Sequence, residues 1–292
     1  MIAQNLDRLP EVVSRGRQLE SGLQLFTASS PELHCYVFIP EKLSDSDRVL
    51  VCVHGVSRNA LEQVRLLRPY AERYGFALIA PLFTPTTFRD YQRLGRRGHG
   101  PRADLALIRM LQTIGSATPL NTNKVSLFGF SGGAQFAHRF AFAHSQRVTS
   151  MVLGAAGWYT MPDTHEPYPF GTTDARGLDA VRFNVRAATR LPTMVVVGSK
   201  DADENAQELN GSAKLIRMQG PHRLARARTW VDAMKASASR HGSTGNIELK
   251  LLPGIGHSFG DAVAVGGLGE LMFEFLDRSA AHAVGGRVLS LA

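Results

Sequence analysis

The sequence predicts an α/β protein in which a mostly parallel sheet carries helices on both faces. Short apolar runs alternate with segments of helical period from Arg48 to Arg278, and this alternation is typical of parallel strands joined by helices. Two further apolar runs precede Arg48 and are joined by a short turn, which predicts an antiparallel hairpin at one edge of the sheet. Since the 292 residues contain no internal repeat, low-complexity tract or linker, we expect a single domain over residues 1–292.

The first elements follow from apolar runs and the residues that interrupt them. The opening hairpin is expected to pair "GLQLFTA" (22–28) with "LHCYVFIP" (33–40). The run "RVLVCVHG" (48–55) is apolar almost throughout, which indicates a strand buried on both faces. A helix is predicted over 60–75, because apolar residues recur at helical spacing and a glycine ends the segment. "FALIAPLF" (76–83) is the next strand.

The second part of the chain repeats the alternation of strand and helix. An Arg- and Gly-rich loop over 84–102 comes first. Strands are then predicted at 124–130, 148–159, 193–198 and 246–252, and helices at 102–115, 132–140, 178–190, 222–242 and 264–278. Residues 160–191 leave room for at most a small cap.

The charge of the chain is basic but dispersed. Lys and Arg number 33 against 25 Asp and Glu, giving a net charge of +8, and the arginines are dense only at 93–97 and 223–228. No RNA- or DNA-binding motif accompanies them, so we expect a solvated basic surface and no nucleic-acid partner. The first twenty residues carry charges throughout and no stretch approaches 18 apolar residues. We therefore expect a cytoplasmic protein with no membrane span.

One predicted strand breaks into "GFSGG" (129–133) and restarts at once as a helix. The flanking glycines let strand and helix pack closely around a sharp turn, which forces the Ser131 hydroxyl outward. The first N–H groups of the helix and its positive dipole end point to the same place. This predicts a serine presented for nucleophilic attack, against the alternative of a plain tight turn.

Backbone donors for a negatively charged oxygen are expected beside this serine. The N–H of Val56, just after the strand that ends at His54, could join the N–H of Gly132. Two such donors would hold the oxyanion of a tetrahedral intermediate. We interpret His54 as a histidine that shapes the loop through hydrogen bonds.

An acid and a base are expected at two further strand ends. Asp201 follows the strand at 193–198 most closely and is the preferred acid, with Asp203, Glu204 and the more distant Asp163 as alternatives. His257 is the one histidine among ten in the loop after the last strand. Strand ends of an open α/β sheet meet at one edge, where chemistry collects. The order Ser, Asp, His along the chain is that of a serine triad on this kind of sheet.

At these residues the chain resembles the α/β-hydrolase superfamily of serine esterases. The resemblance rests on "VCVHGV", "GFSGGA", "VGSKD" and "PGIGHSF", and it extends from about Leu23 to Leu276. It implies an eight-stranded sheet, Ser131 as nucleophile, His257 as base, and Asp201 as its orienting acid. It also implies an oxyanion hole formed by the backbone of Val56 and Gly132. The glycine-rich sequence after the serine is similar to polyhydroxybutyrate-depolymerase and feruloyl-esterase types.

The sheet order that the resemblance implies also bears on the two cysteines. It places the "FALIAPLF" strand between the strand of Cys35 and that of Cys52. Two strand spacings of roughly 4.8 Å each exceed the span of a disulfide. We therefore expect two free, buried thiols.

The expected activity is hydrolysis of small carboxylic esters through an acyl-enzyme, with no cofactor and no metal. Trp158 and Tyr159 could line the substrate pocket or be core aromatics. The arginines of the 84–102 loop could bind a substrate anion or form a solvated loop. The alternatives for function are an amide or peptide hydrolase and a non-catalytic binding protein with the same fold. The sequence makes no prediction about oligomeric state.

Overall fold

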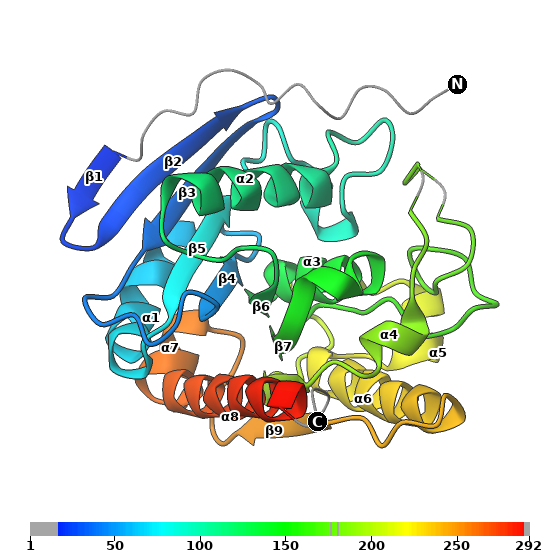
Figure 1. The fold of residues 1–292 in the computed structure, drawn as a ribbon. Helices are drawn as coiled ribbons and strands as arrows, with labels where there is room; N and C mark the ends of the chain where they lie inside the picture. The colour runs from blue at the N-terminus through cyan, green and yellow to red at the C-terminus, as the bar shows by residue number, and fades with distance from the viewer. Residues whose placement is uncertain (1–16, 176, 180, 289–292) are drawn as a thin grey trace.

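A computed structural model describes residues 17–175, 177–179 and 181–288 of the chain. Within them the strands form one sheet. The strands are β1 (Arg17–Glu20), β2 (Leu23–Ser29), β3 (Glu32–Phe38), β4 (Val49–Val53), β5 (Ala77–Leu82), β6 (Val125–Phe130), β7 (Val148–Gly154), β8 (Thr193–Gly198) and β9 (Ile247–Leu252). Their order across the sheet is β1-β2-β3-β5-β4-β6-β7-β8-β9 (Figure 1).

The sheet is antiparallel at its N-terminal edge and parallel elsewhere. β1, β2, β3 and β5 pair antiparallel in that order, and every pairing from β5 through β4 to β9 is parallel. This confirms the predicted fold class and its hairpin edge. The described chain has nine strands, one more than expected. The additional strand, β1, has four mostly exposed residues, so no apolar pattern announces it.

Helices cover both faces of the sheet, as predicted. They are α1 (Ala60–Tyr74), α2 (Ala103–Ala117), α3 (Gly132–Ala143), α4 (Val185–Ala188), α5 (Ala213–Gln219), α6 (Arg223–Arg240), α7 (Phe259–Ala264) and α8 (Leu268–Val288), with 3₁₀ turns at Tyr91–Arg93 and Ser145–Arg147. α1 and α8 pack against each other and against one face. α2 and α3 lie across the sheet from them (Figure 1), and α6 packs on β8 and β9.

The central strands are the most deeply buried. Every residue of β4, β6 and β8 is buried. This confirms the prediction, made for the run that contains β4, of a strand covered on both faces. Cys35 on β3 and Cys52 on β4 are buried and free, with β5 between their strands. The expectation of two unpaired thiols is therefore confirmed.

Two predicted elements are shorter than expected. The helix predicted over 178–190 is the single turn α4. Asn184 caps that turn by accepting a hydrogen bond from the N–H of Ala187 at 2.9 Å, and Pro192 restricts the residue before it. The strand predicted over 148–159 ends at Gly154 because Ala155, with φ of 46°, turns the chain.

Candidate active site

The turn between β6 and α3 holds Ser131 in an unusual backbone conformation. Ser131 has φ of 55° and ψ of −115°, a region that non-glycine residues rarely adopt. The two glycines of the turn are required by close backbone approach. A Cβ on Gly129 would lie 2.2 Å from the carbonyl oxygen of Gly133, and one on Gly133 would lie 1.9 Å from that of Val53. Strand, turn and helix therefore fit together only with glycine at both positions.

Three side chains from separate strand ends form a continuous hydrogen-bonded chain. Nε2 of His257 lies 3.0 Å from Oγ of Ser131, and its Nδ1 lies 2.8 Å from Oδ2 of Asp201. A carboxylate only accepts, so Nδ1–H donates to Asp201, and Nε2 is left to accept from the serine hydroxyl. The Phe130 ring stacks on the imidazole with centroids 5.4 Å apart and helps to fix its orientation. The geometry thus joins the sequence-predicted nucleophile, base and acid.

Asp201 is the acid that the structure brings to His257. It is buried at the end of β8, and its N–H donates to the carbonyl of Gly198 at 3.0 Å. Asp203 is exposed, and its Oδ1 accepts instead from the N–H of Asn205. Asp163, also exposed, caps a local turn by accepting from the N–H of His165. Proximity to the strand end was therefore the right signal for the partner of the histidine.

The two predicted backbone donors flank the serine. Gly132 is the first residue of α3, where helical N–H groups have no partner within the helix. Val56 follows β4 and borders the same cavity as Ser131 and His257. The assignment of their N–H groups as an oxyanion hole remains a prediction.

Comparison with known proteins adds structural relatives. No protein family profile matches the chain. A poly(aspartic acid) hydrolase from Sphingomonas sp. KT-1 superimposes with a TM-score of 0.73 at 24% identity, covering 87% of this chain and 98% of that one. A poly(3-hydroxybutyrate) depolymerase from Bordetella parapertussis gives a TM-score of 0.70 at 25% identity, covering 86% and 88%. This chain has the α/β-hydrolase fold.

One curated sequence relative is more distant. A feruloyl esterase B from Talaromyces funiculosus is 26% identical over 116 residues, which is 38% of this chain. The match spans 33% of the length of that esterase. It supports the predicted resemblance to depolymerases and feruloyl esterases within the α/β-hydrolase fold. Because the match covers only a third of the esterase, it does not assign the activity of that protein to this chain.

The cavity beside Ser131 has a volume of about 270 Å³. Its wall comes from the loop after β4, the start of α1, Phe130, Glu208 and the segment 257–260. Neither of the predicted pocket aromatics lines it. Tyr159 is fully buried and stacks on Trp230, with centroids 4.9 Å apart. Trp158 is 7% exposed, under the guanidinium of Arg139 at 4.2 Å. Both pack as core aromatics, the alternative left open by the sequence.

His54 stabilises the loops next to this cavity, as interpreted from the sequence. It is fully buried; its Nδ1–H donates to the carbonyl of Gly55 at 2.8 Å and its Nε2 accepts from the N–H of Phe83 at 2.9 Å. Burial lowers the pKa of His54 to about 4, opposed in part by its hydrogen bond to Gly55. A neutral imidazole is therefore the folded form at neutral pH, and it ties the end of β4 to the end of β5.

The arginines of the 84–102 loop are largely occupied by carboxylates. Asp90 is buried and pairs with Arg93 at 2.6 Å and with Arg96 at 2.8 Å. Burial alone would raise the pKa of Asp90, but the Arg96 hydrogen bond and the Arg93 charge outweigh it and lower that pKa. Arg102 pairs with Asp104 at 2.6 Å. These contacts give the arginines a structural role in holding the loop.

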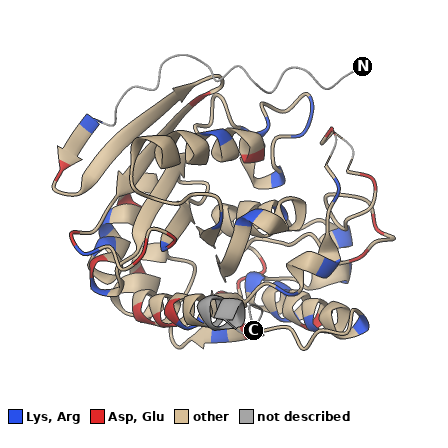
Figure 2. Ribbon diagram, in the orientation of Figure 1, with Lys and Arg blue, Asp and Glu red and all other residues tan. Residues whose placement is uncertain are grey.

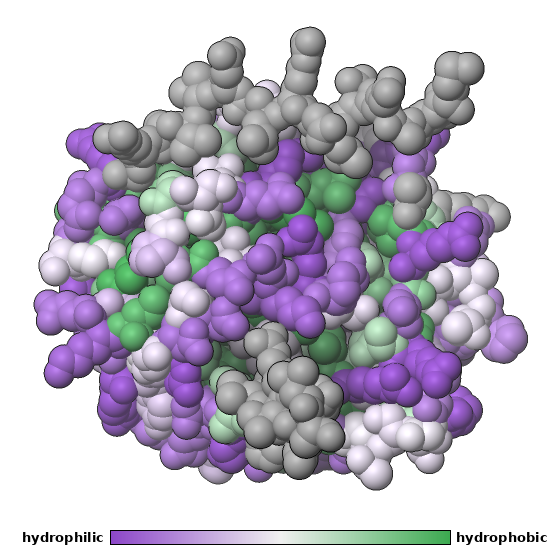
Figure 3. All heavy atoms as spheres, viewed as in Figure 1, coloured by the Kyte–Doolittle hydropathy of each residue, from purple (hydrophilic) through white to green (hydrophobic). Residues whose placement is uncertain are grey.

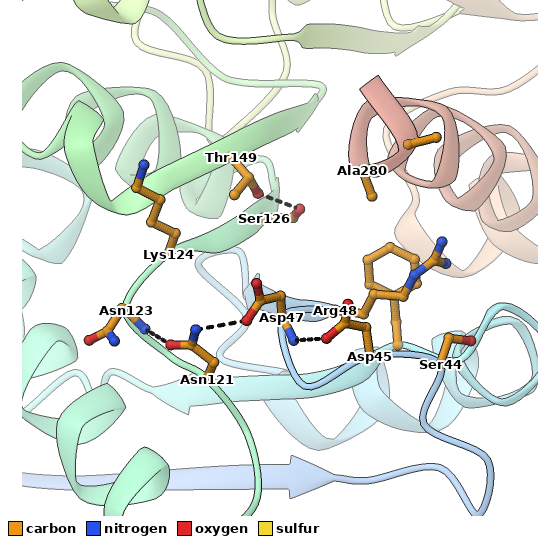
Figure 4. Close-up of a pocket in the computed structure, with 12 residues that line it drawn as sticks. Ser44, Asp45, Asp47, Arg48, Asn121, Asn123, Lys124, Ser126, Thr149 and Ala280 are labelled. Atoms are coloured by element: carbon orange, nitrogen blue, oxygen red, sulfur yellow. Dashed lines mark hydrogen bonds between the residues drawn. The ribbon is translucent and has the colours of Figure 1, made fainter. Parts of the chain in front are cut away.

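A larger cavity lies at the opposite end of the sheet and carries none of the predicted site residues. Its volume is about 440 Å³, and it lies where β4, β6 and β7 begin. Figure 4 shows that several of its polar groups bond to one another: Asn121 donates to Asp47 at 2.7 Å, and the hydroxyls of Ser126 and Thr149 lie 2.9 Å apart. Size alone therefore does not identify the candidate site, since the sequence-predicted nucleophile and base border the smaller cavity.

Two further observations on the described residues concern membrane insertion and metal binding. None of their helices has the length and apolar character needed to cross a bilayer. Within the same part of the chain, no three His, Cys, Asp or Glu side chains gather in a way that could hold a metal ion.

The sequence reasoning missed Arg223 and Glu208 near the site. Arg223 belongs to the arginine-dense stretch 223–228, which was expected to form part of a solvated basic surface, yet it is buried and contacts Asp201. Glu208 lies in a loop of polar residues with no pattern, and it borders the cavity. No local sequence signal separates these residues from solvated neighbours, because their positions depend on how the loop after β8 and the start of α6 return to the strand ends.

Proposed function

We propose that this protein is a serine hydrolase that cleaves small carboxylic esters through an acyl-enzyme intermediate. The observation that carries the proposal is the unbroken contact from Ser131 through His257 to Asp201, at 3.0 and 2.8 Å, at the edge of a cavity. A hydroxyl, an imidazole and a buried carboxylate in this order are the parts that activated serine nucleophiles use.

In the first half-reaction the Ser131 oxygen attacks the ester carbonyl while His257 takes its proton. The tetrahedral oxyanion would be held by the N–H groups of Gly132 and Val56, each worth about 3 kcal/mol in comparable sites. His257 then donates the proton to the leaving alcohol as the carbon–oxygen bond breaks. Asp201 keeps the imidazole in the tautomer that accepts at Nε2 and stabilises its charged form.

In the second half-reaction water takes the place of the alcohol. His257 removes a proton from the water, and the resulting nucleophile attacks the acyl-enzyme. The oxyanion forms again at the same two donors, and its collapse releases the acid and restores the Ser131 hydroxyl. These steps balance with protein groups and water alone, so the proposal calls for no metal or organic cofactor.

Two relatives support ester hydrolysis by their names, which are a depolymerase of poly(3-hydroxybutyrate) and a feruloyl esterase. Amide hydrolysis is the second candidate, because the poly(aspartic acid) hydrolase superimposes with a TM-score of 0.73. The cavity here is bordered by Glu62 and Glu208. These carboxylates would repel an anionic polymer, which favours the ester substrates.

Residues 160–191 are proposed to act as no more than a small cap of one domain.

Labelling with a fluorophosphonate probe tests the nucleophile. Wild-type protein should be labelled, and Ser131→Ala should not. Ser57→Ala removes a second serine that borders the same cavity, and it should still be labelled. The proposal fails if Ser131→Ala, shown to be folded by circular dichroism, is labelled as fast as wild type.

A further inference from the structure

We infer that Arg223 is a positioning residue of the proposed active site, holding the Asp201 carboxylate in the orientation that accepts from His257. The inference rests on the proposed function, since it assigns Arg223 to the same triad. It extends the hydrogen-bonded chain to a fourth side chain that no sequence motif indicated.

The contacts of Asp201 divide between its two oxygens. Oδ2 lies 2.8 Å from Nδ1 of His257, and Oδ1 lies 3.3 Å from Nη1 of Arg223. Two different partners on the two oxygens fix the plane of the carboxyl group, so that it cannot rotate away from the imidazole. The Arg223 contact is long for a charge-assisted hydrogen bond, but such contacts commonly tighten only when substrate binds.

The backbone brings the same two residues together. Arg223 is the first residue of α6, and the N–H of the next residue, Leu224, donates to the carbonyl of Asp201 at 3.1 Å. The start of α6 is therefore fastened to the loop after β8 at both backbone and side-chain level. Any shift of this helix would move the acid relative to His257.

Burial makes this arginine difficult to explain as surface charge. The Arg223 side chain is 3% exposed, as is that of Asp201. Within the described part of the chain, its Nε is buried without a hydrogen-bond partner. A guanidinium that is desolvated and only partly satisfied is costly. A role in holding the proposed catalytic acid would explain why a buried charge with this desolvation cost is present.

Arg223 also places a positive charge next to the Asp201 carboxylate, 3.3 Å from its Oδ1. The other ionisable groups nearby do not replace it. Tyr159 stays neutral, since burial raises its pKa far above the usual value. Arg226 lies one turn along α6, and its guanidinium donates to the carbonyls of Gly220, Gly157 and Asn210.

Arg226 therefore provides a matched control. It is a buried arginine on the same helix and contacts backbone carbonyls, with no carboxylate partner among the described residues. Removing either charge should affect folding stability. Only removal of the Arg223 charge should alter the behaviour of the triad strongly.

The test measures kcat/KM for p-nitrophenyl butyrate, and the rate of fluorophosphonate labelling, from pH 5 to 9. In Arg223→Gln we expect kcat/KM at pH 7 to fall about ten-fold. We expect the acid limb of both profiles to move up by about one pH unit, because the substitution removes the positive charge that contacts Asp201. Arg223→Lys restores the charge without the planar fork, so its acid limb should match wild type at a reduced rate.

Arg226→Gln should lose stability to urea but shift the acid limb by much less than Arg223→Gln. The inference is overturned if folded Arg223→Gln keeps the wild-type acid limb, or if both variants shift equally. It is also overturned if the acid limb of Arg223→Lys moves up by about one pH unit, the shift expected when the charge is lost. This comparison with wild type can be made even where Arg223→Gln does not fold. Absence of labelling in wild type would instead refute the proposed function.

Discussion

At the scale of single residues, the candidate site depends on a few side chains whose positions are restricted by the residues around them. Ser131 is held at positive φ by a turn that only glycine neighbours permit. Asp201 is buried, with each carboxylate oxygen assigned to a different partner. Residues that are this constrained give sharp mutational contrasts, because a neighbour of the same chemical type cannot take their place.

The choice between the two aspartates after β8 gives the first such contrast. Asp201→Asn preserves shape but removes the carboxylate that accepts from His257, so kcat on a p-nitrophenyl ester should fall by about 10³–10⁴. Asp203→Asn changes an exposed side chain whose contact is local, and its kcat should stay within about two-fold of wild type. A larger loss at Asp203 would show that the acid is misassigned.

The sequence predicted that Ser131, Asp201 and His257 meet, because each lies in a loop that starts at the end of a predicted strand, and the structure brings the three side chains into contact. Their catalytic roles stay a prediction. The sequence could not predict the pocket wall in the same way. Tyr159 comes after β7 just as Asp201 comes after β8, yet Tyr159 lies in the core against Trp230. Its direction is set by Ala155, whose positive φ turns the chain after the strand, and positive φ at an alanine leaves no pattern in the sequence.

At the scale of elements, long apolar runs were predicted well and short elements were not. β4 is buried on both faces as expected, and the predicted strands β6 and β8 are likewise buried throughout. α5 and α7, with seven and six residues, were missed because fewer than two helical turns show no clear period. The Arg-rich loop was interpreted only as solvated or anion-binding. The conformation of this loop depends on Asp90, which pairs with Arg93 and Arg96. These partners are close in sequence, but the periodicity of apolar residues does not reveal ion pairs.

The link that His54 makes between the ends of β4 and β5 predicts a pH dependence of stability. Its pKa is lowered from 6.5 to about 4 in the folded protein. At pH 5 the unfolded chain therefore binds a proton that the folded chain does not, so stability rises with pH here. The contribution is complete above about pH 6.5 and is lost as the pH falls toward 4. At pH 5 the loss should be about 2 kcal/mol relative to pH 7.5.

Urea unfolding of wild type and His54→Gln at pH 7.5 and 5.0 measures this loss. Glutamine can still donate and accept a hydrogen bond but does not titrate. The drop in unfolding free energy between the two pH values should be about 2 kcal/mol smaller in the variant. His138, also buried with a pKa lowered mainly by burial, acts in the same direction in both proteins and cancels from the comparison. Equal drops would contradict the role assigned to His54.

At the scale of the whole molecule, the overall charge and the charge at the site have opposite signs. The chain carries a net charge of +8, and Figure 2 shows Lys and Arg on helices and loops on several sides, interspersed with acidic residues. The face in Figure 3 is mostly hydrophilic, with apolar side chains in small separate areas. The cavity beside Ser131 is instead bordered by Glu62 and Glu208, and among the residues that the structure describes no lysine or arginine lines it.

This local charge predicts a preference among ester substrates. Two unit charges 4 Å apart interact by about 1 kcal/mol in water, a factor of about five in rate. The value of kcat/KM for p-nitrophenyl butyrate should therefore exceed that for mono-p-nitrophenyl succinate, a similar ester with an added carboxylate, by about five-fold. Raising the salt concentration from 0.05 to 0.5 M should narrow this ratio, because Glu62 and Glu208 are exposed and their fields are screened.

Glu208→Gln should lower the ratio of kcat/KM for p-nitrophenyl butyrate to that for mono-p-nitrophenyl succinate at low salt. Glu41→Gln serves as the control. Glu41 is also exposed but follows β3, whose last residue, Phe38, pairs with Leu78 near the start of β5. It therefore lies at the end of the sheet away from Ser131, and its replacement should leave the ratio unchanged. Equal narrowing in both variants would mean that net charge sets the preference. An anionic ester that is hydrolysed faster than the neutral one would mean that a basic group reaches the cavity.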